Sequence, residues 1–174
     1  MSQVISSLSR SVIPAPMAGG PTTPELVHAA YAAGSFGTLG LGSASIDSAR
    51  TQIEQCAGIP FGVNFFCPQE PFTEPYLAAA RELAQAENQP LSEPDYSFGY
   101  EEKLELALRG GARVVWSMFG TFTPEQIERI HAAGAEAWTT VTTPTEAIAA
   151  ARGGVDGLCV QGPAAGGHRG TWEG

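Results

Sequence analysis

Short apolar runs alternate with helical patterns along this 174-residue chain, and that alternation limits its fold more than any other feature. Runs with the length and composition of buried strands lie at residues 11–16, 36–41, 60–66, 112–118, 136–141 and 155–160. Helical patterns separate them. Strands that are joined by helical crossovers must run parallel, with right-handed connections. The sequence therefore predicts a parallel α/β fold with six strands.

The predicted helices have clear start and stop signals. Gly34, Gly134 and the pair Gly153-Gly154 end three of them before an apolar run. A threonine can cap a helix through its hydroxyl group, and proline fits the first helical turn because no donor is needed there. Three helices begin with this pair, at Thr23-Pro24, Thr123-Pro124 and Thr143-Pro144. The other helices are predicted at about 45–57, 74–86 and 100–109.

The region of about 67–110 is the longest connection between two predicted strands. It carries several prolines and the two helical segments 74–86 and 100–109. We interpret it as an insertion after the third strand. The chain 1–174 is then a single domain.

Glycine or polar residues follow most of the predicted strands. The loop after the first run lacks the GxGxxG motif of a nucleotide-binding open sheet, so that alternative is weak. Side chains that collect after every strand are typical of a (β/α)8 barrel of the TIM type, whose site lies at the carboxyl ends of its strands. A barrel needs eight strands, and six are predicted. We therefore expect an incomplete barrel, truncated at its C-terminal end.

The segment 159–174, CVQGPAAGGHRGTWEG, is the strongest candidate for a binding loop. Gly166 and Gly167 would let the backbone approach a flat ligand, because glycine has no Cβ atom. The Gln161 amide can donate and accept hydrogen bonds, and His168 can carry a proton near neutral pH.

The composition excludes several classes of function. A formal charge of −9 and an isoelectric point near 4.7 argue against nucleic acid as a partner. Cys56, Cys67 and Cys159 form no CxxC or Cys/His pattern, which predicts reduced thiols and no metal site. There is neither a signal-peptide core nor an apolar run long enough for a membrane span. We expect a cytoplasmic protein.

Three motifs resemble those of the nitronate monooxygenases, formerly called 2-nitropropane dioxygenases, which are flavin-dependent barrel enzymes. They are PAPMAGGPTTPEL at 14–26, FGVNFF at 61–66 and VQGPAAGGHRGTW at 160–172. The resemblance implies FMN as cofactor and the oxidation of an alkyl nitronate with O₂. The alternatives are an NAD(P)H-dependent quinone or enoyl reductase on the same scaffold, and a fragment that binds or associates without turnover.

The resemblance also implies roles for single residues. His168 would act at the substrate, either taking a proton or holding an anion. Asn64 and Gln161 would hydrogen-bond the polar edge of the flavin ring, because amides match its alternating donors and acceptors. The full set of implied cofactor-binding residues is Pro16, Met17, Ala18, Asn64, Thr140, Gln161, Gly166 and Gly167.

Two departures from the family pattern matter. Ala164 stands where relatives often carry an acidic residue. The strands whose loops would grip the FMN phosphate, the seventh and eighth, are missing from the predicted set. We therefore also expect open sheet edges, through which the chain would associate with itself.

Overall fold

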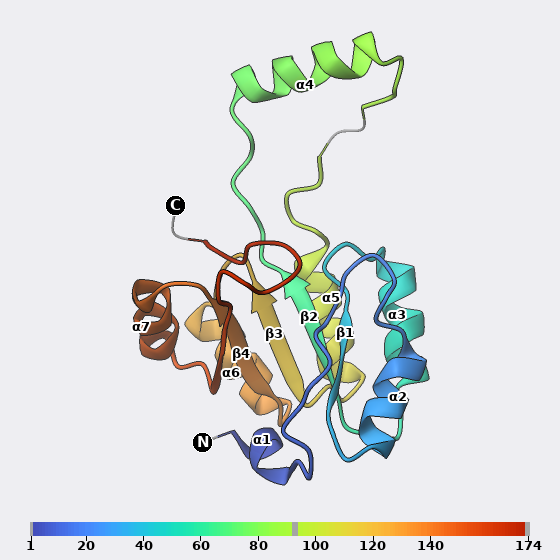
Figure 1. Ribbon diagram of the computed structural model, residues 1–174, viewed down its shortest axis with the longest axis vertical. Coiled ribbons are helices and arrows are strands. Elements are labelled where there is room, and N and C mark those ends of the chain that lie inside the picture. The colour runs from blue at the N-terminus through green and yellow to red at the C-terminus, as the bar shows by residue number, and fades with distance from the viewer. Residues whose placement is uncertain (1, 92–93, 173–174) are drawn as a thin grey trace.

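The computed structural model describes residues 2–91 and 94–172. In this part of the chain, five parallel strands form one sheet in the order in which they occur in the sequence (Figure 1). The fold is therefore a parallel α/β arrangement of the barrel type, with two free edges. The strands are β1 (Gly37–Gly40), β2 (Phe61–Phe66), β3 (Val114–Met118), β4 (Glu136–Val141) and β5 (Gly157–Val160).

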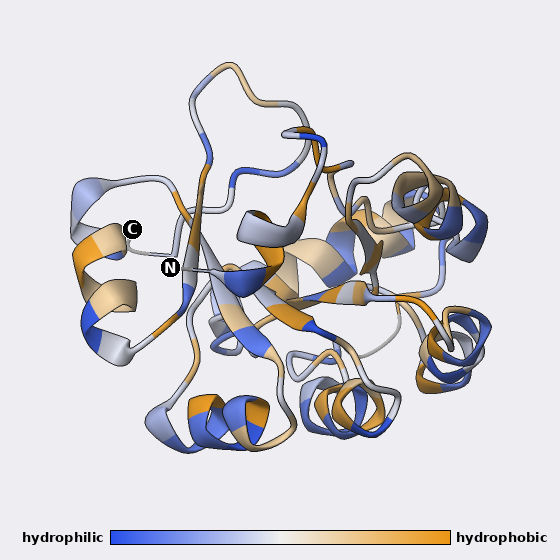
Figure 2. Cartoon of the chain, turned by 90° about the horizontal axis from the view of Figure 1, so that it is seen from below, coloured by the Kyte–Doolittle hydropathy of each residue, from blue (hydrophilic) through white to orange (hydrophobic). Residues whose placement is uncertain are grey.

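Most of the helices cover the outer face of the sheet. Figure 2 shows them as an arc around the strands, with the short helix at residues 3–7 on the inner side. This is the layering of a (β/α) barrel, in which the helices lie outside the strands. The helices are α1 (Gln3–Ser7), α2 (Pro24–Ala32), α3 (Ile46–Gln55), α4 (Glu74–Ala86), α5 (Tyr100–Arg109), α6 (Pro124–Ala132) and α7 (Pro144–Gly153).

The predicted helix starts at threonine-proline pairs are confirmed. The Thr23 hydroxyl accepts from the backbone N of Leu26, at 3.4 Å. Thr123 and Thr143 also form capping boxes, in which the side chain of the third residue after the threonine accepts from the backbone N of the threonine. Four donors that would otherwise be unpaired in α6 and α7 are thereby satisfied.

Two apolar layers lie on opposite faces of the sheet. The larger one packs the strands against the outer helices and contains Leu39, Val63 and Val115. The smaller one lies on the inner face and contains Val114, Trp116 and Trp138, together with Val4, Phe36 and their partly buried neighbours. Alternate residues of a strand point to opposite faces, so a strand buried on both faces reads as one continuous apolar run.

The prediction of a strand at residues 11–16 is wrong. The segment is extended, but it pairs with no strand of the described sheet. Pro14 and Pro16 have no N–H group, so the segment offers few donors to a ladder. Its observed contacts are with side chains instead. The Ser35 hydroxyl donates to the Val12 carbonyl, and the Thr22 hydroxyl donates to the Ala15 carbonyl.

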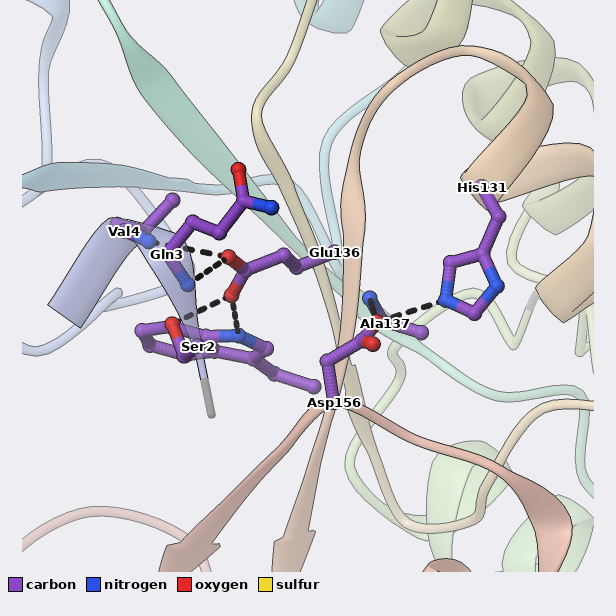
Figure 3. A network of polar contacts seen from close by, with 8 residues as sticks. Ser2, Gln3, Val4, His131, Glu136, Ala137 and Asp156 are labelled. Carbon is purple, nitrogen blue, oxygen red and sulfur yellow. Dashed lines mark hydrogen bonds and ion pairs between the residues drawn. The ribbon is translucent and has the colours of Figure 1, made fainter. Parts of the chain in front are cut away.

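Helix α1 was not predicted, and one carboxylate holds it in place. Glu136, at the start of β4, accepts from the Ser2 hydroxyl at 2.5 Å and from the backbone N of Gln3 and Val4 at 2.6 and 3.0 Å (Figure 3). It also accepts from Trp138 Nε1 at 2.9 Å. Partial burial alone would raise the pKa of Glu136, but these hydrogen bonds outweigh it and the pKa is lowered.

The connection between β2 and β3 has two different parts. Helix α5 packs on the sheet and against α3, as an ordinary crossover helix does. Helix α4 instead stands away from the body on two extended segments (Figure 1), and none of its residues is buried. We call residues 67–99 the α4 arm. It exposes Phe72, Tyr76 and Leu83.

Cys56, Cys67 and Cys159 are all free thiols. Within the part of the chain that the structure describes, no helix is both long enough and apolar enough to cross a membrane.

Candidate functional site

A cavity of about 560 Å³ opens at the carboxyl ends of the strands. Every residue that the sequence predicts for the site lines it: Pro16, Met17, Ala18, Asn64, Thr140, Gln161, Gly166, Gly167 and His168. The parallel sheet brings these residues together, because the ends of parallel strands meet at one edge. Further lining residues were not predicted from the sequence, among them Phe66, Trp116, Met118 and Cys159.

The segment 15–18 forms one wall of the cavity. The backbone N of Met17 donates to the Thr22 hydroxyl at 2.8 Å, which fixes the turn that follows. The Met17 backbone also lies against β1. A Cβ atom placed on Gly40 would come within 2.6 Å of the Met17 carbonyl, so only glycine fits there.

Asn64 is buried on β2, between β1 and β3. Its Nδ2 donates to the Trp116 carbonyl at 3.1 Å. This bond orients the amide and leaves Oδ1 without a partner among the described residues. Asn64 therefore has an acceptor to offer a ligand in the cavity.

The Gln161 amide is used by its own loop. Nε2 donates to the His168 carbonyl at 2.7 Å, and Oε1 accepts from the backbone N of Gly170, also at 2.7 Å. These two bonds tie the end of β5 to the far side of the glycine loop. Gln161 thus shapes the loop, and its predicted contact with a flavin stays a prediction.

Glu146 anchors the other end of the same loop. This buried carboxylate accepts from Thr171 Oγ1 and from the backbone N of Trp172, both at 2.9 Å. It also accepts from the backbone N of Thr142 and Thr143 at the start of α7. The sequence signal for this residue was the Thr-Pro-Thr-Glu start of α7, which indicates a capping box but not a loop anchor.

Thr140 lies in the wall of the cavity, but its hydroxyl is already engaged. Oγ1 accepts from Trp116 Nε1 at 2.8 Å, and the Thr140 carbonyl accepts from Trp172 Nε1 at 3.1 Å. Thr140 therefore joins the sheet, the inner apolar layer and the loop.

The His168 ring rests against two phenylalanines at the mouth of the cavity. Its centroid lies 6.4 Å from that of Phe66 and 6.2 Å from that of Phe119. Phe66 packs closely against the backbone of Gly42, because a Cβ atom at that position would clash with the Phe66 ring. The buried Lys103 fixes the loop after β1 by donating to the Leu41 and Gly42 carbonyls at 2.9 and 3.1 Å.

The lining of the cavity carries little charge. Among the described residues that line it, His168 is the only basic side chain and no carboxylate is present. Burial raises the pKa of the Cys159 thiol, so this group stays protonated at neutral pH. No group of three or more His, Cys, Asp or Glu side chains that could hold a metal ion occurs in the described ranges.

The model of one protein family, nitronate monooxygenase, matches residues 3–174. The chain belongs to the nitronate monooxygenase family. Its curated relatives include a probable nitronate monooxygenase from Staphylococcus aureus (strain Newman), 31% identical over 179 residues. Another, from Staphylococcus saprophyticus, is 32% identical over 175 residues. These alignments cover 95% and 93% of this chain but 49% and 48% of the relatives.

Solved structures also resemble this chain over about half of their own length. Nitroalkane oxidase from Streptomyces ansochromogenes is 35% identical and superposes with a TM-score of 0.87, over 99% of this chain and 52% of that one. FabK from Thermotoga maritima is 20% identical, with a TM-score of 0.64 over 92% of this chain and 43% of its own, and shares the fold. The chain spans about half the length of the relatives that it matches.

Proposed function

We propose that the cavity binds the isoalloxazine ring of FMN and that the chain serves in the oxidation of alkyl nitronates with O₂. The observation that carries this proposal is the convergence of the three sequence motifs, which are far apart in the chain, on one cavity. Membership of the nitronate monooxygenase family supports the reaction class.

The lining of the cavity suits the flavin ring better than the phosphate. Its volume lies in the range typical of cofactor sites. Trp116, Met118 and Cys159 offer an apolar surface for the ring, and the open Oδ1 of Asn64 offers an acceptor for its polar edge. No lysine or arginine is found among the described lining residues, so the phosphate has no cation there.

Bound FMN would supply the redox chemistry and the reaction with O₂. The chain's own residues would position the two reactants. The segment 15–18 and the glycine loop would hold the ring from two sides, while His168 would face the substrate at the mouth of the cavity. There its imidazole can accept a proton, or hold an anionic substrate when protonated.

The reductase alternative has weaker support. The relatives named for nitronates or nitroalkanes are 31% to 35% identical to this chain. The free thiols agree with a cytoplasmic location, which we also propose.

The assignment of His168 is tested with a His168→Ala variant of any flavin-binding polypeptide that contains this chain. We expect kcat/KM for a nitronate to fall by about 10²-fold or more, with FMN still bound, because a general base is lost. His28→Ala is the matched control, since His28 lies on α2, bonds to the Gln55 carbonyl and is not among the described residues that line the cavity. An unchanged rate in His168→Ala would remove this residue from the mechanism.

A further inference from the structure

Gln69 lies at the foot of the α4 arm and connects it to the loop after β3. Its side-chain Nε2 donates to the Phe119 carbonyl at 3.1 Å and to the Cys67 and Pro68 carbonyls at 2.9 and 3.2 Å. Its backbone N donates to the Tyr96 carbonyl, at 2.9 Å, in the returning segment of the arm. One residue thus joins both segments of the arm to the loop after β3, whose Phe119 ring contacts His168.

Phe119 adopts a backbone conformation that is unfavourable for its residue type. Its φ is +62°, in the left-handed region that side chains with a Cβ atom rarely enter. Such a conformation persists only where the surroundings hold it. Two hydrogen bonds hold this turn: Gln69 bonds the Phe119 carbonyl, and the Ser117 hydroxyl donates to the Gly120 carbonyl at 2.9 Å.

The left-handed turn directs the Phe119 ring toward His168. The rings of Phe119 and Phe66 are 5.0 Å apart, and the His168 ring contacts both. The His168 ring makes no hydrogen bond to any described residue, so these aromatic contacts set its orientation. Figure 1 shows the C-terminal loop that carries His168 beside the foot of the arm.

We propose that Gln69 is a positioning residue for His168 and acts through Phe119. By holding the Phe119 turn, the Gln69 amide keeps the aromatic wall in place against which the imidazole rests. This role rests on the proposed function of His168. It gives the α4 arm a physical connection to the site through its foot, although α4 itself stands far from the body.

The test compares Gln69→Met, which keeps the length of the side chain but removes its donor, with Phe119→Leu. Gln85→Met, on the exposed face of α4, is the matched control. In the 174-residue chain, we expect both test variants to shift the NMR resonances of the His168 ring, because ring currents from Phe119 change. Gln69→Met in the Phe119→Leu background should add no further shift, since the two act in series. The control should leave these resonances unchanged.

Turnover gives a second readout in a flavin-binding form. Gln69→Met should lower kcat about tenfold with little change in FMN affinity, as expected for a misplaced catalytic group. The inference is overturned if Gln69→Met leaves both the His168 resonances and kcat unchanged, or if it adds its own shift in the Phe119→Leu background. If the resonances shift as expected but no form turns over a nitronate, the positioning role stands and the proposed function fails.

Discussion

Asn64 and Gln161 are two amides at the ends of strands, but they differ in what is left of their hydrogen-bonding capacity. Asn64 donates a hydrogen bond from Nδ2 to a strand carbonyl, and its Oδ1 remains available to a ligand. Gln161 uses both Nε2 and Oε1 in hydrogen bonds to the loop that carries His168. Residue type and spacing give both amides the same predicted role, and only the contacts separate them.

Replacing each amide by leucine should therefore have different results. Asn64→Leu should weaken flavin binding by about 1–3 kcal/mol, because a polar edge of the ring loses its partner. Gln161→Leu should first release the glycine loop, so limited proteolysis within 162–170 should become faster. Isothermal titration with flavin and a proteolysis time course distinguish the two. Equal flavin affinity of Asn64→Leu and the unaltered chain would show that this amide serves the sheet alone.

Helix α1 is too short to be stable alone. Val4 packs in the inner apolar layer, and the polar contacts of the helix to the sheet converge on the carboxylate of Glu136. Replacing Glu136 by glutamine removes the charge and turns one acceptor into a donor that faces other donors. We expect Glu136→Gln to lower the free energy of unfolding by about 1–3 kcal/mol at pH 7, as for the loss of several hydrogen bonds to a charged, partly buried group.

The same carboxylate makes this stabilisation depend on pH. Because the pKa of Glu136 is lowered in the folded chain, its contribution is complete above the unfolded pKa of about 4.3 and is lost as the pH falls through the folded value. Urea unfolding at pH 7 and at acidic pH should therefore show a smaller pH dependence for Glu136→Gln. Identical pH dependence in both proteins would contradict the role of Glu136.

Helices α4 and α5 are adjacent in the chain but contribute differently to stability. Leu104 of α5 is fully buried in the outer apolar layer, whereas Leu83 of α4 is 65% exposed. Leu104→Ala should cost about 2–5 kcal/mol through a lost core contact and a cavity. Leu83→Ala should change stability by less than about 0.5 kcal/mol, which is typical of exposed sites. A comparable loss in thermal unfolding for both variants would mean that α4 packs on the body in solution.

The sequence predicts the elements better than their partners. The strands that became β1 to β5 and the threonine caps follow local rules, so pattern and propensity identify them. The segment 11–16 has a strand-like pattern too, but pairing needs donors and a neighbour, which no local pattern contains. The separation of α4 from the sheet is equally invisible, because its amphipathic pattern is that of a packed helix.

The site residues, too, divide into those that local patterns predict and those that depend on the whole sheet. Motif residues such as Asn64 and His168 were predicted together because parallel strands end at one edge. Trp116, Met118 and Phe66 were missed because their inward direction depends on strand register, which is set by the whole sheet. The position of Glu146 depends on Thr171 and Trp172, 25 and 26 residues further along the chain.

The sheet ends in two edge strands, β1 and β5; the residues of β1 are buried, whereas the edge at β5 is apolar and exposed. Leu158 and Val160 of β5 are 42% and 75% exposed. An unpaired apolar edge strand is a template for pairing with another chain. A second apolar hollow of about 290 Å³ lies on the inner face, between Trp138 and Leu158. We therefore propose that the 174-residue chain on its own associates through the β5 edge.

The flavin site of that chain should show the same incompleteness. Its cavity offers contacts to the ring but has no lysine or arginine among its described lining residues, so the phosphate should add little affinity. We expect the 174-residue chain to bind FMN and riboflavin within about threefold of each other, and at least about a hundredfold more weakly than a full-length relative binds FMN. It should show no nitronate oxidation.

Flavin fluorescence titrations with FMN and with riboflavin measure the two affinities, and light scattering measures whether the chain is a monomer. If FMN binds much more tightly than riboflavin, a phosphate site lies within these 174 residues, and a monodisperse monomer that oxidises nitronate would show that five strands suffice for the reaction.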